Sequence, residues 1–529
     1  MTSELPQDEQ VDTRKKMLRG GIFMSMSPFS SLILGLIVSW QITLFISPSQ
    51  YGLFEWFNVL SSFFITLIPF RMPNALGRYI AYSIGKEDEV SVERLRKSLT
   101  VLSMILVPVS GLVAFLVTPF VLSSVGRGSE YLLIDGLIFT FGVMALNLSA
   151  FTKSIASAYR EFRSLGIGNF LANVTSQVVV LVLIPLGWGI RALFMKSLVL
   201  GLFTAIFLYL TVKNIFSIRG ALYPLKPLIK FAYPPIIAFL FAYVLNEVLI
   251  RAIFQYYGTL GFGGDLGLYG FASRLVTFVN AFTIGYYSTI GSYYTVALGK
   301  STKDLNDVFQ WTVRMSFFVF TPMIVICLVM APSAFLMVFP HYYWAYQYFA
   351  ILTIQLYFFL FLRPLHAVLS ASAKTEYILA SSILASIISG FLMFILIDYG
   401  LMLVLVGYIS NGLFIALFSV IFVKKSVPDL NLNVAKIWQF SIVAFFALGP
   451  AVVVHFLRIN PILELVINVT MFVAIYVGAT RFLRLVTDSE IRKAMVFLPA
   501  RLVKPVTKFL ILLFIRKSEA NHTSMRNQE

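Results

Sequence analysis

Charged residues are scarce in this chain. Only 12% of its 529 residues are Asp, Glu, Lys or Arg, whereas 59% are hydrophobic and 16% are aromatic. Soluble globular domains have about 25% charged residues, and a soluble protein this apolar would expose large adhesive patches. The composition therefore excludes an ordinary soluble domain and indicates a protein that lies in a lipid bilayer.

Cysteine and histidine are scarce as well. The single cysteine, Cys327, excludes an intrachain disulfide, and the four histidines have no metal-ligand spacing. No Walker-type glycine loop is present, so direct use of ATP is not expected. We therefore expect no metal site, no catalytic residues and no cofactor, and we predict that the chain is not an enzyme.

The sequence instead contains many long hydrophobic runs. A helix of about 20 apolar residues is long enough to cross the hydrocarbon core of a membrane. Hydropathy predicts an all-α polytopic membrane protein with about fourteen transmembrane helices. The predicted spans are 20–46, 53–84, 98–124, 131–158, 165–186, 189–212, 232–257, 268–298, 307–330, 346–371, 376–397, 400–423, 438–457 and 462–480.

Basic residues are distributed unevenly among the connections between these spans. Thirty of the 41 Lys and Arg residues lie in the terminal segments and in every second connection, and three lie in the others. The positive-inside rule then predicts a plasma-membrane protein with both termini in the cytoplasm. The same bias explains most of the net charge of +17, so that charge gives no reason to expect nucleic-acid binding.

One sequence pattern occurs twice. "SPSQYGLFEWFNVLSSFFITLIP" opens the second predicted span, and "GGDLGLYGFASRLVTFVNAFTIG" opens the eighth. Each has a Tyr-Gly pair at the predicted outer mouth, at Tyr51 and at Tyr269, before a long apolar helix. Duplicated halves of this kind flank a central site in many transporters. The pattern therefore predicts an internal repeat.

The domain organisation follows from this repeat. We predict two pseudo-symmetric six-helix lobes, at 1–220 and 221–425, followed by two additional spans at 426–480. The remaining residues, 481–529, form a basic cytoplasmic tail, in which a short apolar run between basic residues predicts an amphipathic helix on the membrane surface.

The amino-terminal motifs resemble a known family. The order of "RKKMLRGG", a long span, "SPSQYGLFEWF" and "RMPNALGRYIA" is similar to the amino terminus of prokaryotic polysaccharide flippases. These are the Wzx-like members of the multidrug/oligosaccharidyl-lipid/polysaccharide exporter superfamily. The resemblance implies a transporter that flips a polyprenyl (di)phosphate-linked oligosaccharide across the plasma membrane by alternating access. It also implies that the partners are this lipid-linked oligosaccharide, membrane lipid and polysaccharide-assembly enzymes.

Eight cations lie inside predicted spans, where a charge exposed to lipid is costly. Arg71 and Arg78 are two helical turns apart and share one helix face with Asn74. A water-filled cleft lined by such cations would attract a phosphate-bearing head group, which arginine binds through its bidentate fork. We therefore predict a substrate-binding set in a cationic central cavity. Its members are Arg71, Arg78, Arg274, Arg363, Arg251, Lys153 and Asn74.

Several of these cations have a simpler alternative explanation. Arg78 and Lys153 can extend to the cytoplasmic interface, and Arg251 can pair with Glu247, one turn before it. Lys196 and Arg314 lie near predicted membrane interfaces, and we assign them to those interfaces.

Two carboxylates, Glu55 and Glu247, lie clearly inside predicted spans. Either can carry a coupling proton or bind sodium, so both are predicted ion-coupling residues. The sequence shows too few further ligands to choose between the two ions.

Three other functions remain open. A small-molecule or multidrug exporter of the same fold needs fewer cavity cations, because its substrates are often cationic. A membrane-embedded glycosyltransferase generally has acidic residues in a sizeable outer loop, whereas the longest outer connection here, 331–345, contains no Asp or Glu. A passive channel or a scaffold is the third alternative, and measured flux would separate it from a transporter.

Overall fold

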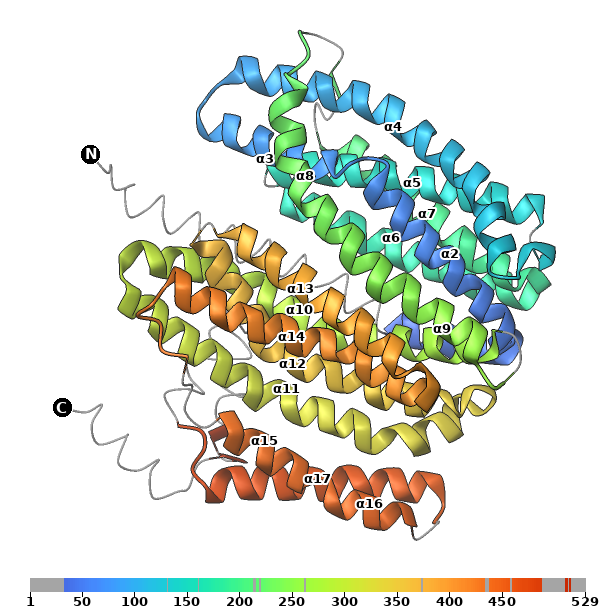
Figure 1. Cartoon of the computed structure of the whole chain (residues 1–529), viewed down its shortest axis with the longest axis vertical. Helices are drawn as coiled ribbons and strands as arrows, with labels where there is room; N and C mark the ends of the chain where they lie inside the picture. The colour runs from blue at the N-terminus through green and yellow to red at the C-terminus, as the bar shows by residue number, and fades with distance from the viewer. Residues whose placement is uncertain are drawn as a thin grey trace. The chain divides into compact units, whose positions relative to one another are not determined.

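The computed structural model is helical wherever it has regular secondary structure (Figure 1). It describes residues 33–130, 132–159, 161–212, 216–217, 220–260, 263–372, 374–432, 437–456, 459–487, 510–511 and 513–514. The amino-terminal basic segment and most of the predicted cytoplasmic tail lie outside the described residues. Within them, the predicted all-α class is confirmed.

Residue contacts divide the chain into two compact units. Unit 1 comprises Met1–Gly285 and Ser382–Tyr408, and unit 2 comprises Tyr286–Ser381 and Ile409–Glu529. Three long helices, α10, α13 and α14, contribute residues to both units. The two lobes predicted from the repeat have a different boundary, at residue 220, and stay a prediction.

The helices are long and follow one another with short connections. From the amino terminus these are α2 (Pro48–Leu67), α3 (Met72–Gly85), α4 (Glu89–Ser124), α5 (Leu133–Ala158), α6 (Phe162–Leu183), α7 (Ile190–Thr211), α8 (Leu225–Ala242), α9 (Leu249–Tyr257) and α10 (Gly264–Lys300). They continue as α11 (Thr302–Val338), α12 (Ala345–Ala371), α13 (Thr375–Ile395), α14 (Leu401–Ser426), α15 (Ile437–Phe446), α16 (Gly449–Phe456) and α17 (Pro461–Phe482).

These helices fall on the predicted spans. Among the described residues, ten helices are long and apolar enough to cross a membrane, and the bent pair of α2 and α3 makes an eleventh candidate. The other three predicted spans fall on the helix Ile33–Phe45, on α10 and on the pair of α15 and α16, which do not meet both criteria. The chain is therefore a polytopic helical membrane protein.

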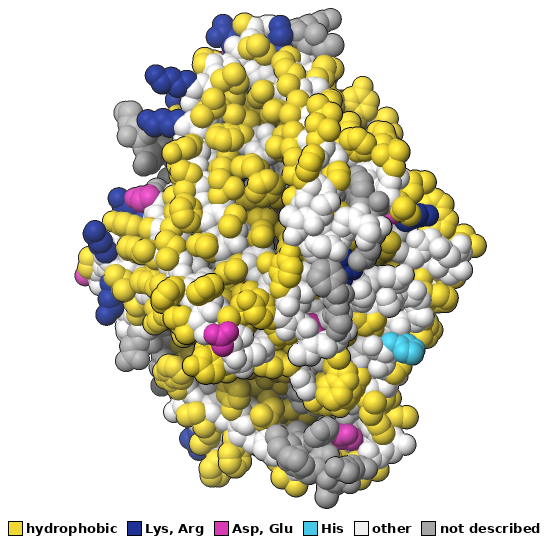
Figure 2. Space-filling model, turned by 45° about the vertical axis from the view of Figure 1, so that its right-hand side comes forward, with side chains coloured by type: hydrophobic (Ala, Val, Ile, Leu, Met, Phe, Trp, Pro, Cys, Tyr) yellow, Lys and Arg dark blue, Asp and Glu magenta, His cyan; other side chains and the backbone are white. Residues whose placement is uncertain are grey.

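The surface agrees with that conclusion. Hydrophobic side chains cover most of the face seen in Figure 2, and most of the Lys and Arg side chains visible there lie near its margins. Large side chains such as Phe120, Leu210 and Trp438 are each more than 70% exposed. Surface this apolar is stable in contact with lipid and would aggregate in water.

α4 and α11 correspond to each other in detail. They have 36 and 37 residues, and each begins at a side-chain cap, Asp88 for α4 and Ser301 for α11. Each contains two prolines, and Pro119 and Pro332 lie equally far beyond these caps. Hydrogen bonds from the hydroxyl and amide of Ser91 lower the pKa of Asp88, which keeps this cap ionised. The two helices extend the internal repeat well beyond the two Tyr-Gly pairs.

Each of these two helices also donates a side-chain hydrogen bond to a connecting segment of its own unit. In unit 1, Lys97 of α4 donates a hydrogen bond to the carbonyl oxygen of Gly220 at 2.5 Å. In unit 2, Gln310 of α11, at the equivalent position, donates to the carbonyl oxygen of Asn431 at 2.5 Å. A side chain at one helical position therefore fixes a connecting segment in both copies of the repeat.

The second predicted span breaks at Phe70 and Arg71, between α2 and α3. Both residues have left-handed backbone, with φ of 52° and 48°, a conformation that costs an L-residue about 1–2 kcal/mol. The two helices are bent by 42°. Pro69 and Pro73 flank the break. Strain of this kind is concentrated at functional sites, and here it positions Arg71.

Within unit 1, α2 and α10 meet backbone to backbone near their amino-terminal ends. A Cβ atom on Gly267 would lie 1.7 Å from the carbonyl oxygen of Pro48, and one on Gly52 would lie 2.4 Å from that of Gly263. Only glycine permits this approach, as in other close helix pairs in membranes. The two helices that carry the repeated Tyr-Gly pairs are therefore in direct contact.

This contact predicts a strong effect of a small substitution. Gly267→Ala should destabilise the protein by about 1–3 kcal/mol, because the added methyl group forces two backbones apart. Gly478→Ala in α17 is the matched control, since nothing lies within 4 Å of that position. Thermal unfolding of the purified variants in one detergent measures both effects. An equal result for the two variants would contradict the close contact.

Candidate functional site

Arg71, Asn74 and Arg78 lie along one face of α3. Arg71 is partly exposed at the break before the helix, and Asn74 and Arg78 are exposed. The opposite face, with Leu76 and Ile80, is fully buried in a core cluster. The helix therefore presents two guanidinium groups and an amide on a face that the core does not occupy, as the spacing in the sequence predicts.

Both arginines pack on aromatic rings of α8. The guanidinium carbon of Arg78 is 4.4 Å from the centre of the Phe231 ring, and that of Arg71 is 6.0 Å from the centre of the Phe239 ring. α3 and α8 lie side by side in unit 1 (Figure 1). Neither arginine is ion-paired with a carboxylate among the described residues. Their charge is therefore stabilised by ring faces and stays available to an anion.

Arg274 lies on α10 close to α2. Its guanidinium is 5.9 Å from the centre of the Phe278 ring and within hydrogen-bonding reach of the Tyr51 hydroxyl. The Nη2 atom is buried and donates to no partner in the part of the chain that the structure describes. Arg274 therefore has a spare hydrogen-bond donor at a buried position.

Arg251 of α9 differs, because two carboxylates surround it. Its Nη1 lies 2.6 Å from Oε2 of Glu247, and its Nη2 lies 3.3 Å from Oε2 of Glu55 on α2. The Tyr408 hydroxyl donates to Glu247 Oε1 at 2.9 Å, and Asn58 Nδ2 donates to Glu55 Oε1 at 3.3 Å. We call these five residues the ion-paired cluster.

The ion-paired cluster shows which partners Arg251 has. The i,i+4 pairing of Arg251 with Glu247, the simpler alternative from the sequence, is confirmed, and Glu55 adds a second partner. Two carboxylates balance one guanidinium, so the charge of Arg251 is already neutralised locally. Substrate binding by Arg251 and ion coupling by Glu55 and Glu247 stay predictions.

The helix geometry at Glu247 is unusual. Tyr243–Val248, between α8 and α9, form a π-helical turn. Such turns often occur at functional sites, because the wider turn redirects side chains. Here it presents Glu247 to Arg251, while the neighbouring Asn246 donates to the Ser386 hydroxyl at 2.9 Å.

The other two predicted cations are Lys153 and Arg363. Lys153 of α5 is half-buried, beside Ser154, which donates to the carbonyl oxygen of Pro73 at the start of α3. Arg363 of α12 belongs to unit 2, with its guanidinium 5.4 Å from the centre of the Tyr287 ring and 5.5 Å from that of Phe359. Aromatic packing is therefore common to Arg71, Arg78, Arg274 and Arg363.

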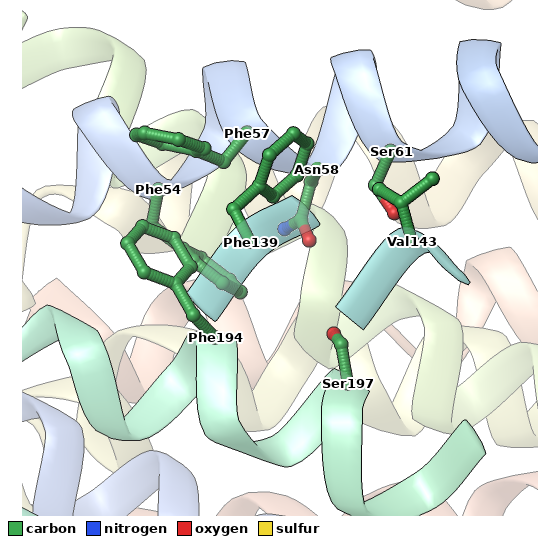
Figure 3. Close-up of a pocket in the computed structure, with 8 residues that line it drawn as sticks. All are labelled: Phe54, Phe57, Asn58, Ser61, Phe139, Val143, Phe194 and Ser197. Carbon is green, nitrogen blue, oxygen red and sulfur yellow. The ribbon is translucent and has the colours of Figure 1, made fainter. Parts of the chain in front are cut away.

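A small pocket lies among α2, α5 and α7 in unit 1 (Figure 3). Phenylalanine rings form much of its wall, and the amide of Asn58 and the hydroxyl of Ser197 face it. Its lining residues are Phe54, Phe57, Asn58, Ser61, Phe139, Val143, Phe194 and Ser197. Because Asn58 also bonds Glu55, the pocket adjoins the ion-paired cluster.

Sequence reasoning did not single out Asn58, and it assigned Lys196 to a membrane interface. Lys196 lies on α7 between the pocket residues Phe194 and Ser197. No Asp or Glu lies three or four residues from Lys196, so its own helix supplies no counter-charge. Asn58 gave no signal, because asparagine in a span usually joins helices.

The fold is that of a known class of membrane transporter. One similar structure is described as the inward-facing conformation of a multidrug resistance MATE family transporter of the MOP superfamily, with a TM-score of 0.63 and 15% identity over 78% of this chain and 100% of that chain. Another is the lipid II flippase MurJ in an inward closed conformation, with a TM-score of 0.65 and 16% identity over 87% and 98%. At these identities the likeness shows the fold alone.

A match between sequences identifies the family. Residues 43–344, more than half of the chain, match the family described as polysaccharide biosynthesis protein. The chain belongs to this family, which confirms the predicted resemblance at the level of polysaccharide biosynthesis. Comparison with curated protein sequences finds no match.

Proposed function

We propose that the chain flips a polyprenyl (di)phosphate-linked oligosaccharide across the plasma membrane. The head group crosses through a cationic central cavity by alternating access, while the lipid tail stays in the bilayer. Both termini are cytoplasmic, and the chain acts as a transporter and not as an enzyme. Polysaccharide-assembly enzymes supply or consume the glycan on either side of the membrane.

One observation carries this proposal: the arginine face of α3. Arg71 and Arg78 are held on the Phe239 and Phe231 rings without ion-paired carboxylates among the described residues. An arginine inside a membrane protein is costly unless water or an anion meets it. Phosphate suits this role, because its oxygens accept two parallel hydrogen bonds from one guanidinium. The strained break at Arg71 supports the same site.

Family and fold support the choice of substrate. The family is one of polysaccharide biosynthesis, and one structural neighbour is a lipid II flippase. Both point to a glycan built on a lipid carrier. In this mechanism Glu55 or Glu247 takes up a proton or sodium ion, which weakens the hold on Arg251 and couples the ion to the conformational change.

A second candidate is a small-molecule exporter, because several structural neighbours are MATE transporters. The unneutralised arginines of α3 favour an anionic substrate over the cationic compounds that such exporters often carry. A transport assay with both kinds of substrate therefore separates the two candidates.

A deletion experiment tests the proposal in cells. Cells that lack the chain should accumulate a lipid-linked glycan on the cytoplasmic face and lose the corresponding surface polysaccharide. Mass spectrometry of extracted lipids identifies the glycan, and the wild-type chain supplied in trans should restore export. Unchanged glycans, together with increased sensitivity to cationic compounds, would favour the exporter instead.

A further inference from the structure

Arg127 lies in the turn that follows α4, and its side chain is 0% exposed. A guanidinium group is costly to bury unless its N–H groups find acceptors. Here Nη1 donates to the carbonyl oxygen of Ser49 at 3.1 Å, and Nη2 donates to the Ser49 hydroxyl at 3.5 Å. Ser49 lies in the first turn of α2. These two hydrogen bonds therefore fix the guanidinium group of Arg127 at the beginning of α2.

The same guanidinium group lies against Gly263, the residue before α10. A Cβ atom at this position would be 1.3 Å from Nη2 of Arg127 and 2.6 Å from its Cζ. Gly263 also has left-handed backbone, with φ of 79°, which glycine adopts without steric cost. Arg127 thus occupies the space that a side chain at position 263 would need. We call this the arginine–glycine contact.

A second contact joins the end of α4 to α9, the helix before α10. The hydroxyl of Tyr256, on α9, donates to the carbonyl oxygen of Ser124, the last residue of α4, at 2.7 Å. The backbone contacts of Gly52 and Gly267 described above join α2 to α10 near the same end. Polar and backbone groups make these contacts, and water can solvate such groups when they separate.

These four helices come from different copies of the predicted repeat. α2 and α4 belong to the first copy, whereas α9 and α10 belong to the second. In α11, the counterpart of α4, Pro340 lies as far beyond the helix cap as Arg127 lies beyond the cap of α4. Proline has no hydrogen-bond donor. The fold that the two copies share therefore does not require an arginine at this position.

We propose that Arg127 is a positioning residue that limits how closely α10 approaches α2 and α4 at the outer face, and that the arginine–glycine contact opens when the head group leaves. The proposal rests on the proposed function, because alternating access moves the copies of a repeat apart at one face at a time. The positive-inside rule assigns the turn that holds Arg127 to the outer face. Water solvates the guanidinium group on opening, which lowers the cost of separation. The hydrogen bond of Tyr256 closes the same end.

Cysteine labelling of the full-length chain in nanodiscs tests this proposal. In a chain with Cys327→Ser, a single cysteine replaces either Leu266, which is 0% exposed near the start of α10, or Asn74, which is exposed on α3. A water-soluble maleimide reacts with Leu266→Cys when the outer end opens. It reacts with Asn74→Cys when the inner end is open. The two labelling rates therefore report the two ends of the transporter separately.

Gly263→Ala should raise the labelling rate of Leu266→Cys about tenfold and lower that of Asn74→Cys, because the added methyl group collides with the guanidinium group only when the outer end is closed. Adding Arg127→Ala to Gly263→Ala should return both rates toward those of wild type, since the methyl group then has room. Tyr256→Phe removes one hydrogen bond and should raise labelling of Leu266→Cys about twofold.

Gly187→Ala is the matched control. Gly187 has similar left-handed backbone, with φ of 84°, but nothing lies within 4 Å of a Cβ atom added there. Its substitution should leave both labelling rates unchanged. Unchanged rates in Gly263→Ala would overturn the proposal. Equal rises at Leu266→Cys and Asn74→Cys with a lower unfolding temperature would also overturn it, because the contact would then stabilise the fold in every state.

A flipping assay keeps this result apart from the proposed function. If the wild-type chain flips a lipid-linked glycan but Gly263→Ala does not alter labelling, the role of Arg127 is wrong and the function stands. If Gly263→Ala shifts the two labelling rates in opposite directions but the wild-type chain flips no lipid-linked glycan, the role of Arg127 stands and the proposed substrate is wrong.

Discussion

Replacing both Arg71 and Arg78 with alanine should abolish flipping of the lipid-linked glycan while the chain still inserts into the membrane. Each guanidinium lost removes charge-assisted hydrogen bonds worth about 1.5–3 kcal/mol. Two losses together correspond to more than about a hundredfold in binding. The backbone strain at Arg71 does not change, because alanine meets the same left-handed cost as arginine. Surface glycan and membrane-fraction immunoblots measure the two outcomes.

Two further variants make this test specific. Lysine at both positions keeps the charge but loses the planar fork, so we expect intermediate export. Lys374→Ala is the control, since Lys374 is an exposed lysine that lies 3.9 Å from Glu376. Full export by the double alanine variant would show that the arginine face of α3 does not bind the substrate.

Arg251→Leu should destabilise the protein more than any other single substitution considered for unit 1. It leaves the buried carboxylate of Glu55 and the partly exposed carboxylate of Glu247 without their positive partner. Breaking a buried ion pair by removing one member costs about 3–5 kcal/mol. We expect a large fall in the unfolding temperature of the solubilised protein, measured by fluorescence-detected size exclusion after heating.

A compensating variant identifies the cause. Arg251→Leu combined with Glu55→Gln and Glu247→Gln removes all three charges and should recover most of the lost stability, since a neutral cluster needs no counter-ion. Export by this stable variant then reports the role of the residues: restored export means that the cluster is structural, and lost export means that it binds substrate or a coupling ion. An unfolding temperature of Arg251→Leu equal to that of wild type would contradict the ion-paired cluster.

The sequence predicts most of the fold, because membrane spans are local. Each needs only a continuous apolar run, so all fourteen predicted ranges coincide with helices, although the helix Ile33–Phe45 is described only from residue 33 onward. Proline shows where the local sequence is insufficient. Pro69 and Pro73 flank a real break, whereas Pro108, Pro322 and Pro364 lie inside helices that continue. Whether a proline breaks a helix depends on neighbours that satisfy the freed carbonyl group, which the local sequence does not contain.

The candidate site is less predictable, because it depends on contacts between distant residues. The face shared by Arg71 and Arg78 follows from helical spacing, and so does the pairing of Arg251 with Glu247. The contact of Arg251 with Glu55 joins residues 196 positions apart. The hydrogen bond from Tyr408 to Glu247 likewise joins residues 161 positions apart. No helical periodicity predicts these approaches, since they depend on how the helices pack.

The most direct measurement for the central claim is flipping in reconstituted vesicles. The purified chain, placed in liposomes with a fluorescent polyprenyl-diphosphate oligosaccharide, should expose the labelled head group to an external quencher far faster than protein-free liposomes do. The double alanine variant of Arg71 and Arg78 should match the protein-free rate. Rapid flipping that persists in this variant, or a wild-type chain that moves only cationic small molecules, would contradict the claim.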